Sequence, residues 1–357
     1  MTSDTVPQST ATLWADNFFA YFNLFFPILS RPHFMHQLVT QPQKMDPLLR
    51  NAVFAIGSHY TKHVHETDCV SRQFFNQCRS MLHLSSGKPT LSSLQALVIM
   101  CWYSYLQDDM QTCSELRLTL IACLRELNLG CDPGTSLDTV NVELRRRAFW
   151  TSYVIDQWLT VCTGHRLMSL RREKWDCKWP QLEDTALQVT AFSQMIKLAQ
   201  IMGDSHEPHQ QPLEAALTEW LLNLPSYLEY GKSDDDTPPS PMAKIYRILY
   251  YTVQIMLHRP SFDHPNDFSR SICMTAANTI IHVAEQMHWH DQVRYLYNTF
   301  NTSLSLATSI HLDAVLHAGF DNVPARINLA KSVRLLKDTN CTLLPQPEFE
   351  HLLDHFL

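Results

Sequence analysis

The sequence predicts an all-α fold, and three observations lead to that prediction. Apolar residues recur at helical spacing through most of the chain. No stretch keeps the strict alternation of apolar and polar residues that is typical of a strand. Near the middle of the chain, the residues between Asn141 and Thr163 include neither glycine nor proline. A long central helix is therefore expected there.

Composition limits the possible functions. The chain has 357 residues, of which 45% are hydrophobic, enough for a large core. The net charge is -7, whereas a stand-alone nucleic-acid binder usually has a basic surface. Only 8 glycines occur, which leaves little capacity for a glycine-rich nucleotide site. No apolar run approaches the roughly 18 residues of a membrane span, and the polar N-terminus is not a secretory signal.

The first half of the chain is expected to hold six helices. Residues 1–11 are predicted to be a disordered lead. Asp108-Asp109 places an acid at a helix start, and Gly130 is expected to cap the end of that helix. The expected helices are an aromatic one from Leu13 that ends at Pro27, one opened by Asp46-Pro47, those over 67–84, 91–106 and 143–162, and one that follows Asp108-Asp109 and carries Cys113 to Leu127 on one face.

The second half is expected to be helical up to the C-terminus. Residues 203–212 and 231–241 read as flexible loops, because they are polar and rich in proline, serine and aspartate. One domain over 12–357 is predicted, with two helical lobes in contact across 203–241 as the alternative. The expected helices cover 184–202, 213–224, 242–258, 267–289, 292–317, 323–339 and 348–357.

The central helix is apolar on nearly every side, which is typical of a helix packed on several neighbours. Glu143 and Arg147 stand at i,i+4 with the acid first, the favourable order for an intrahelical ion pair. Arg146 falls within the apolar arc, and a buried charge without a partner is costly. We therefore expect a carboxylate or carbonyl from another helix beside Arg146, and a donor beside Asp156.

Motifs along the chain resemble the regulatory (middle homology) domain of fungal zinc-cluster transcription factors. The central helix carries Glu-x-Arg-Arg-Arg-x-Phe-Trp-x-x-Tyr-x-x-Asp over 143–156. Similar motifs stand before and after it: Ser-Leu-Gln-Ala-Leu at 93–97, Leu-Arg-Glu-Leu-Asn-Leu-Gly at 124–130, and Leu-His-Arg-Pro at 257–260. Gly-His-Arg at 164–166 departs from the family's Gly-Arg-Pro. The residues that carry the signature are Glu143, Arg145, Arg146, Arg147, Trp150, Asp156, Gly164, His258, Arg259 and Pro260.

The resemblance implies a nuclear transcription regulator that controls a metabolic or secondary-metabolite gene set. It implies a homo- or heterodimer and contact with a coactivator. The family's zinc cluster uses Cys-x2-Cys pairs, and none of the 10 cysteines forms one. No cofactor and no DNA-binding residue is thus expected in this chain. Zinc and DNA contact would come from an upstream six-cysteine cluster or from a partner.

Two alternatives stay open. The first is a co-regulator without its own DNA-binding module that acts by dimerising with intact family members. The second is an all-α enzyme that acts on a hydrophobic metabolite. No Gly-x-Ser-x-Gly, Walker A or Gly-x-Gly-x-x-Gly motif is present, and we expect no catalytic residue.

Other features have a functional and a structural interpretation. The arginines at 145–147 could contact phosphate or form ion pairs within the fold, and we favour ion pairing. The basic residues over 166–174 could bind an acidic partner or belong to a solvated loop. The histidine pairs 59/63 and 351/355 have metal-ligand spacing that chance also explains. Residues 348–357 resemble an activation segment or a closing helix. A possible effector pocket, with core packing as its alternative, consists of Trp102, Tyr103, Tyr153 and Trp158.

Overall fold

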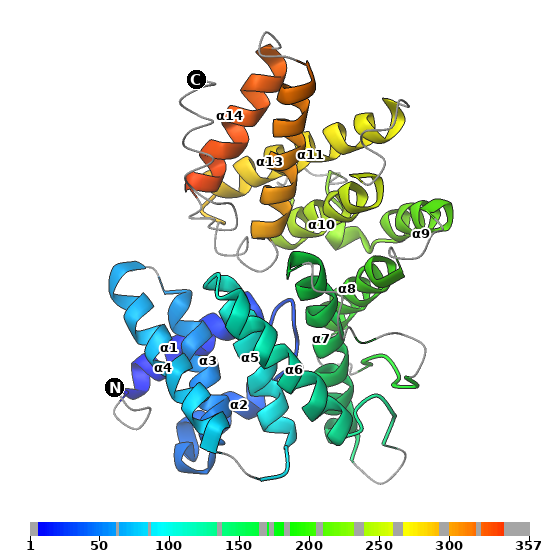
Figure 1. Cartoon of the computed structure of the whole chain (residues 1–357). Coiled ribbons are helices and arrows are strands. Elements are labelled where there is room, and N and C mark those ends of the chain that lie inside the picture. Colours follow the sequence, from blue (N-terminus) through cyan, green and yellow to red (C-terminus); the bar gives the residue numbers. More distant parts are fainter. Residues whose placement is uncertain are drawn as a thin grey trace. The chain divides into compact units, whose positions relative to one another are not determined.

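The computed structural model confirms the all-α prediction. Every regular element in its described ranges is a helix (Figure 1). These ranges are 6–61, 64–84, 87–133, 138–163, 170, 175–181, 186–204, 210–231, 239–259, 267–292, 300–318 and 323–338. The chain divides into an N-terminal unit, Met1–Ala199, and a C-terminal unit, Gln200–Leu357. The prediction of a single domain, or of two lobes in contact, stays a prediction.

The N-terminal unit is built from helices that follow one another closely. The α7 helix is buried from Arg147 to Thr160, as its apolar character predicted. The elements are α1 (Gln8–Asn17), the π-helical turn η2 (Phe18–Phe22), α2 (Arg31–Thr40), the 3-10 turn η3 (Pro42–Lys44), α3 (Pro47–His59), α4 (Val64–Leu84), α5 (Leu91–Leu106), α6 (Met110–Glu126), α7 (Thr139–Thr163) and α8 (Ala186–Asp204), whose last residues belong to the second unit.

The first elements depart from the sequence prediction in three ways. The α1 helix begins at Gln8, inside the predicted disordered lead. The aromatic helix ends in η2 at Phe22, before Pro27, because the Asn23 amide bonds both the N–H and the C=O of Leu29 at 3.0 and 3.2 Å and turns the chain. The α2 helix was not predicted; Pro32 lies in its first turn, where proline is tolerated.

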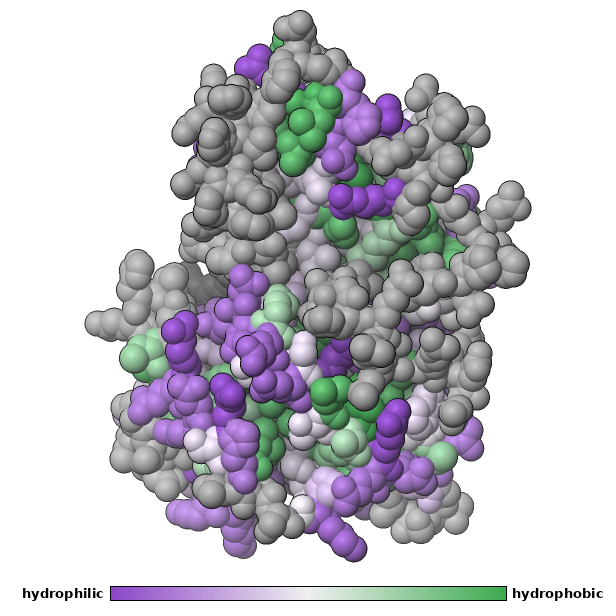
Figure 2. All heavy atoms as spheres, viewed as in Figure 1, coloured by the Kyte–Doolittle hydropathy of each residue, from purple (hydrophilic) through white to green (hydrophobic). Residues whose placement is uncertain are grey.

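The core of the N-terminal unit forms around α3 and α5. The α3 helix packs on α1, α4 and α5, and α5 packs in turn on α6 and α7 (Figure 1). Asp46-Pro47 opens α3 as predicted, and the Asp46 carboxylate caps the helix by accepting from the N–H groups of Leu48 and Leu49. Gly57 allows α1 to approach α3, because a Cβ there would lie 2.0 Å from the Trp14 carbonyl oxygen. Hydrophilic side chains gather over α3 and α4 on the face in Figure 2.

The C-terminal unit is organised around α10, which packs on α9, η7, α11 and α13. Ser240 caps α10, and Pro241 takes its first position. Residues 293–299, the loop residues 205–209 and 232–238, and 348–357 lie outside the described residues. The elements are α9 (Gln210–Leu222), the 3-10 turn η7 (Ser226–Leu228), α10 (Pro241–His258), α11 (Asp267–Trp289), α13 (Phe300–Ala318) and α14 (Val323–Asp338).

Candidate functional site

The family-like motif of α7 begins with a buried ion pair. Arg147 Nε donates to Glu143 Oε1 at 2.9 Å, and the two residues are only 6% and 2% exposed. This contact confirms the pair predicted from the i,i+4 spacing. Because both charges are withdrawn from water, each depends on the other for its stability in the fold.

Arg146 has the carboxylate partner that the sequence required, but the partner comes from a loop and not from another helix. Its Nε and Nη2 donate to the two carboxylate oxygens of Asp132 at 2.9 and 2.6 Å. The Arg146 hydrogen bond holds the pKa of the Asp132 carboxyl below its ordinary value. Arg145 donates to the Leu127 carbonyl at 2.8 Å. All three arginines therefore make contacts within the fold, which supports pairing over phosphate contact.

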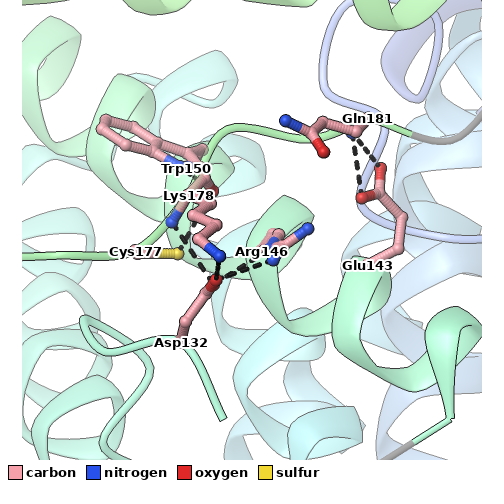
Figure 3. A network of polar contacts seen from close by, with 7 residues as sticks. All are labelled: Asp132, Glu143, Arg146, Trp150, Cys177, Lys178 and Gln181. Carbon is pink, nitrogen blue, oxygen red and sulfur yellow. Dashed lines mark hydrogen bonds and ion pairs between the residues drawn. The ribbon is translucent and has the colours of Figure 1, made fainter. Parts of the chain in front are cut away.

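Residues of the α7 motif also hold residues 175–181, hereafter the strap, against α7 (Figure 3). Trp150 Nε1 donates to the Lys178 carbonyl at 2.9 Å, and the Gln181 N–H donates to both Glu143 oxygens at 3.0 and 3.2 Å. Asp132 also accepts from the Lys178 N–H at 3.3 Å. Glu143, Trp150 and, through Asp132, Arg146 thus fix one extended segment.

Gly130 has a different role from the predicted helix cap. The α6 helix ends at Glu126, and the residue with a left-handed backbone is Asn128, at φ 49°. A Cβ on Gly130 would lie 1.8 Å from Cε3 of Trp175, so the glycine makes room for that ring. Its carbonyl accepts from the N–H groups of Asp176 and Cys177, both at 3.0 Å. Gly130 is therefore part of the seat of the strap.

Asp156 has the donor that was expected, and that donor is Arg117 of α6. Arg117 Nε lies 2.5 Å from Asp156 Oδ1, and its Nη2 also bonds the Thr160 hydroxyl. The second oxygen of Asp156 accepts from the N–H of Leu170 at 2.7 Å. Burial raises the pKa of the Asp156 carboxyl, against the lowering effects of Arg117 and of the Leu170 N–H. The pair links α6, α7 and the chain beyond α7.

Arg117 and Asp132 were not identified from the sequence. Arg117 lies among the apolar residues of α6, beside Leu116, Leu120 and Ile121, and a charge on that face was a signal for a buried partner. Asp132 had no comparable signal, because its loop position does not identify Arg146 as its neighbour.

At the end of α10, the motif residues His258 and Arg259 join three helices. His258 Nε2 lies 3.4 Å from Glu214 of α9, and its Nδ1 lies 3.4 Å from the Ser269 hydroxyl of α11. Arg259 donates to the Ser309 hydroxyl of α13 at 2.7 Å. Burial lowers the pKa of His258, and Glu214 acts in the opposite direction. Two other motif residues, Gly164 and Pro260, lie outside the described residues.

The four aromatic residues of the possible effector pocket are all buried, between 1% and 3% exposed. Trp102 packs on Phe26, with ring centroids 5.0 Å apart, and the Tyr103 hydroxyl lies 2.9 Å from that of Ser71. Tyr153 contacts Trp150 within α7, and Trp158 is 1% exposed. These contacts are what core packing provides, and a pocket at these residues stays a prediction.

In the described part of the chain, no three or more His, Cys, Asp or Glu residues are grouped to hold a metal ion. His63, His351 and His355 of the two histidine pairs lie outside it, as does the basic stretch 166–169 and 171–174. The zinc cluster of the resembling family does not fit the cysteines present, which include no Cys-x2-Cys pair. None of the helices described has the length and apolarity to cross a membrane.

Comparison with known proteins finds a matching family and several relatives. Residues 15–262 match the model of the fungal specific transcription factor domain. The chain is 23% identical to the acetamidase regulatory protein of Aspergillus fumigatus, over 91% of the chain and 45% of that protein. It is 25% identical to an uncharacterized transcriptional regulatory protein of Schizosaccharomyces pombe, over 74% of the chain and 38% of that protein.

A third relative is cutinase transcription factor 1 alpha of Fusarium vanettenii, which is 20% identical over 81% of the chain and 36% of that protein. The chain thus spans less than half the length of these curated relatives. No solved structure matches it significantly.

Proposed function

The chain belongs to the family of the fungal specific transcription factor domain, and from that premise we propose that it is the regulatory part of a transcription regulator acting in the nucleus. The observation that carries the proposal is the family match over residues 15–262, which includes the whole polar network of α7. The relatives named as transcriptional regulators support it.

The contacts of the α7 arginines indicate that these residues serve the fold and that DNA is bound elsewhere. Arg146 and Arg147 are paired with carboxylates, and Arg145 donates to a backbone carbonyl, so their charges serve the fold. With a net charge of -7, the chain offers no general attraction for DNA. DNA contact and zinc would come from a six-cysteine cluster upstream or from a partner, and the chain itself acts without a cofactor and without catalysis.

Regulation would work by a shift between states of the helical units. A ligand or partner changes such an equilibrium only if it binds one state more tightly than the other. The strap and the end of α10 each join several elements, and they are the parts where a bound effector or a coactivator would change the packing. Dimerisation, with itself or with related regulators, would bring two DNA-binding modules together.

The proposal is tested by fusing residues 1–357 to a heterologous DNA-binding module and measuring a reporter gene that carries the matching site. The expected result is a change in reporter expression relative to the module alone, in either direction. A matched pair of variants separates fold from charge: Arg146→Gln breaks the pair with Asp132, and Arg31→Gln removes an exposed arginine. A fusion that is folded, nuclear and without effect on the reporter contradicts the proposal.

The alternative, a co-regulator, is tested on the native protein. Protein isolated from its native source is assayed for binding to DNA at physiological salt and for its mass in solution. Binding to DNA by the isolated protein excludes the co-regulator, whereas a complex with a second, DNA-binding family member favours it.

A further inference from the structure

A cavity of about 190 Å³ opens on the C-terminal unit between the end of α9, the segment that follows it, and α10. Four leucines form its apolar lining: Leu221, Leu222, Leu224 and Leu228. Its remaining lining is Arg247, Tyr230 and Glu229. Predominantly apolar walls with a few polar groups are typical of small-molecule sites.

Arg247 enters this lining with unused hydrogen-bond donors. Its guanidinium lies 4.9 Å from the centre of the Tyr251 ring, and Nη2 donates to the hydroxyl of the same tyrosine at 2.9 Å. Its Nε is buried and has no acceptor. Among the residues that the structure describes, no carboxylate pairs with Arg247. An arginine stays charged at every physiological pH, so this guanidinium has no charge partner among the described residues.

A second cation lies one turn away on α10. Lys244 is 1% exposed, and its Nζ donates to the Gln292 amide oxygen at 3.1 Å. Within the described ranges it has no carboxylate partner either, and burial lowers the pKa of its ammonium group. Residues at i and i+3 are neighbours on a helix surface, so Lys244 adds positive potential near Arg247.

We propose that this cavity binds a small monocarboxylic acid with an apolar body, whose carboxylate pairs with Arg247 and whose hydrocarbon part packs on the four leucines. The proposal rests on the proposed function, since it names the class of effector that the regulatory domain receives. The carboxylate is the planar acceptor that a guanidinium binds best. The apolar walls disfavour a ligand that is charged at both ends, and Glu229 repels a second negative charge.

The cavity also limits the size of the acid. Its volume equals the share of roughly six water molecules in the liquid, at about 30 Å³ each. An acid of roughly six to nine non-hydrogen atoms therefore fits, such as hexanoate or benzoate. Because the lining comes from α9, the segment after it and α10, a bound acid stabilises the packing of these elements on one another.

The first experiment titrates the full chain with sodium hexanoate, followed by calorimetry and by saturation-transfer NMR. We expect one site with a Kd of about 0.1–1 mM, as befits a ligand of this size. Hexanamide has the same shape without the charge, and hexylammonium has the opposite charge. Both should bind at least about 10-fold more weakly, since a hydrogen bond to a charged group has that effect.

Variants of the lining residues then test whether hexanoate binds in this cavity. Arg247→Gln should weaken hexanoate binding about 10-fold or more, and Arg247→Lys should weaken it less. Leu221→Trp places a larger side chain in the lining and should abolish binding without removing the cation. Arg334→Gln is the matched control, because Arg334 is an exposed arginine on α14 with a side chain that is 85% exposed. Glu229→Gln should strengthen binding.

Two outcomes overturn the inference. One is the absence of saturable hexanoate and benzoate binding to the folded chain up to about 10 mM, a range well above the expected Kd. The other is binding that neither Arg247→Gln nor Leu221→Trp changes. The reporter fusion measures regulation independently of these acids, so an active fusion without acid binding refutes the inference and leaves the proposed function standing.

Discussion

The most deeply buried polar contacts of the two units differ in chemistry. In the N-terminal unit, arginines pair with carboxylates: Arg147 with Glu143, Arg117 with Asp156, and Arg146 with Asp132. In the C-terminal unit, a histidine bonds neutral partners, since His311 lies 2.6 Å from the Ser332 hydroxyl and 3.0 Å from the Asn278 amide oxygen. There the Thr252 and Ser303 hydroxyls also bond each other, at 2.7 Å.

This difference determines how each unit responds to pH. Arginine keeps its charge throughout the physiological range, so each ion pair of the N-terminal unit keeps its cation as the pH falls below 7. His311 must stay neutral, because burial lowers its pKa to about 4. The N-terminal unit should therefore resist mild acid, whereas the C-terminal unit should lose stability in it.

The largest effect is expected from breaking the most buried pair. Arg117→Met leaves Asp156, whose side chain is fully buried, without its cation. Removing one partner of such a pair costs about 3–5 kcal/mol. Urea unfolding, followed by hydrogen exchange of the amides of α6 and α7, measures the loss. The double variant Arg117→Met with Asp156→Asn removes both charges and should be more stable than the single one; a single variant with native stability excludes a major role for the pair.

The second prediction concerns the stability of the C-terminal unit as the pH is lowered. The unfolded chain binds a proton at His311 at about pH 6.5, before the folded chain does, so stability falls as the pH drops below about 6.5. The loss approaches about 3 kcal/mol once the pH falls below the folded pKa of about 4. His258 changes in the same direction, because burial lowers its pKa as well.

Hydrogen exchange measured between pH 7.5 and 4.5 compares the stability of the two units within one molecule. Amides of α11, α13 and α14 should lose protection before those of α5 and α7. His311→Gln removes the proton-binding group and should flatten the pH dependence, although its stability at pH 7 is lower. Equal loss of protection in both units, or an unchanged pH dependence of stability in the variant, contradicts this difference between the units.

The sequence was informative where an interaction is local. The spacing of Glu143 and Arg147 was sufficient to predict their pair, and the apolar surroundings of Arg146 and Asp156 showed that each required a partner. The partners themselves depended on tertiary structure. Asp132 comes from a loop 14 residues before Arg146, and the sequence does not reveal which way that loop folds.

Gly130 shows most directly that sequence patterns do not reveal tertiary contacts. A glycine a few residues after a helix is typical of a cap, and that local reading was wrong. The need for a small residue comes from Trp175, which is 45 residues away in sequence but in contact in the fold. The motif resemblance identified Gly130 as part of a pattern, and only the packing explains its role.

The contact of Gly130 with Trp175 allows an intermediate test. Gly130→Ala forces a methyl group into the indole ring and should displace the strap, at a cost of about 1–3 kcal/mol. Tryptophan fluorescence should change with it. Gly87→Ala is the matched control, because nothing lies within 4 Å of a Cβ at that position. A similar effect at both sites indicates that backbone freedom, and not the indole ring, selects glycine at residue 130.

The smallest effect concerns Asp132, which sharpens the comparison of ion pairs within the N-terminal unit. Asp132→Asn keeps the shape of the side chain but removes its charge, and should cost about 1 kcal/mol at pH 7. Arg146 holds the folded pKa of Asp132 below its unfolded value of about 4, so this stability is present above pH 4 and is lost as the pH falls through the folded pKa. Variant and native chain should therefore converge once the pH falls below the folded pKa of Asp132.

Asp16→Asn is the control for that measurement. It removes the charge of Asp16 from the contact with Arg31, whose two side chains are 44% and 60% exposed, and exposed pairs contribute little. Hydrogen exchange of α7 and the strap is the readout, since it follows this network separately from the C-terminal unit. If both variants leave the strap equally protected, Arg146 and Asp132 contribute no more than a surface pair. If only Asp132→Asn exposes it, the charge of Asp132 is what fastens the strap to the signature arginine.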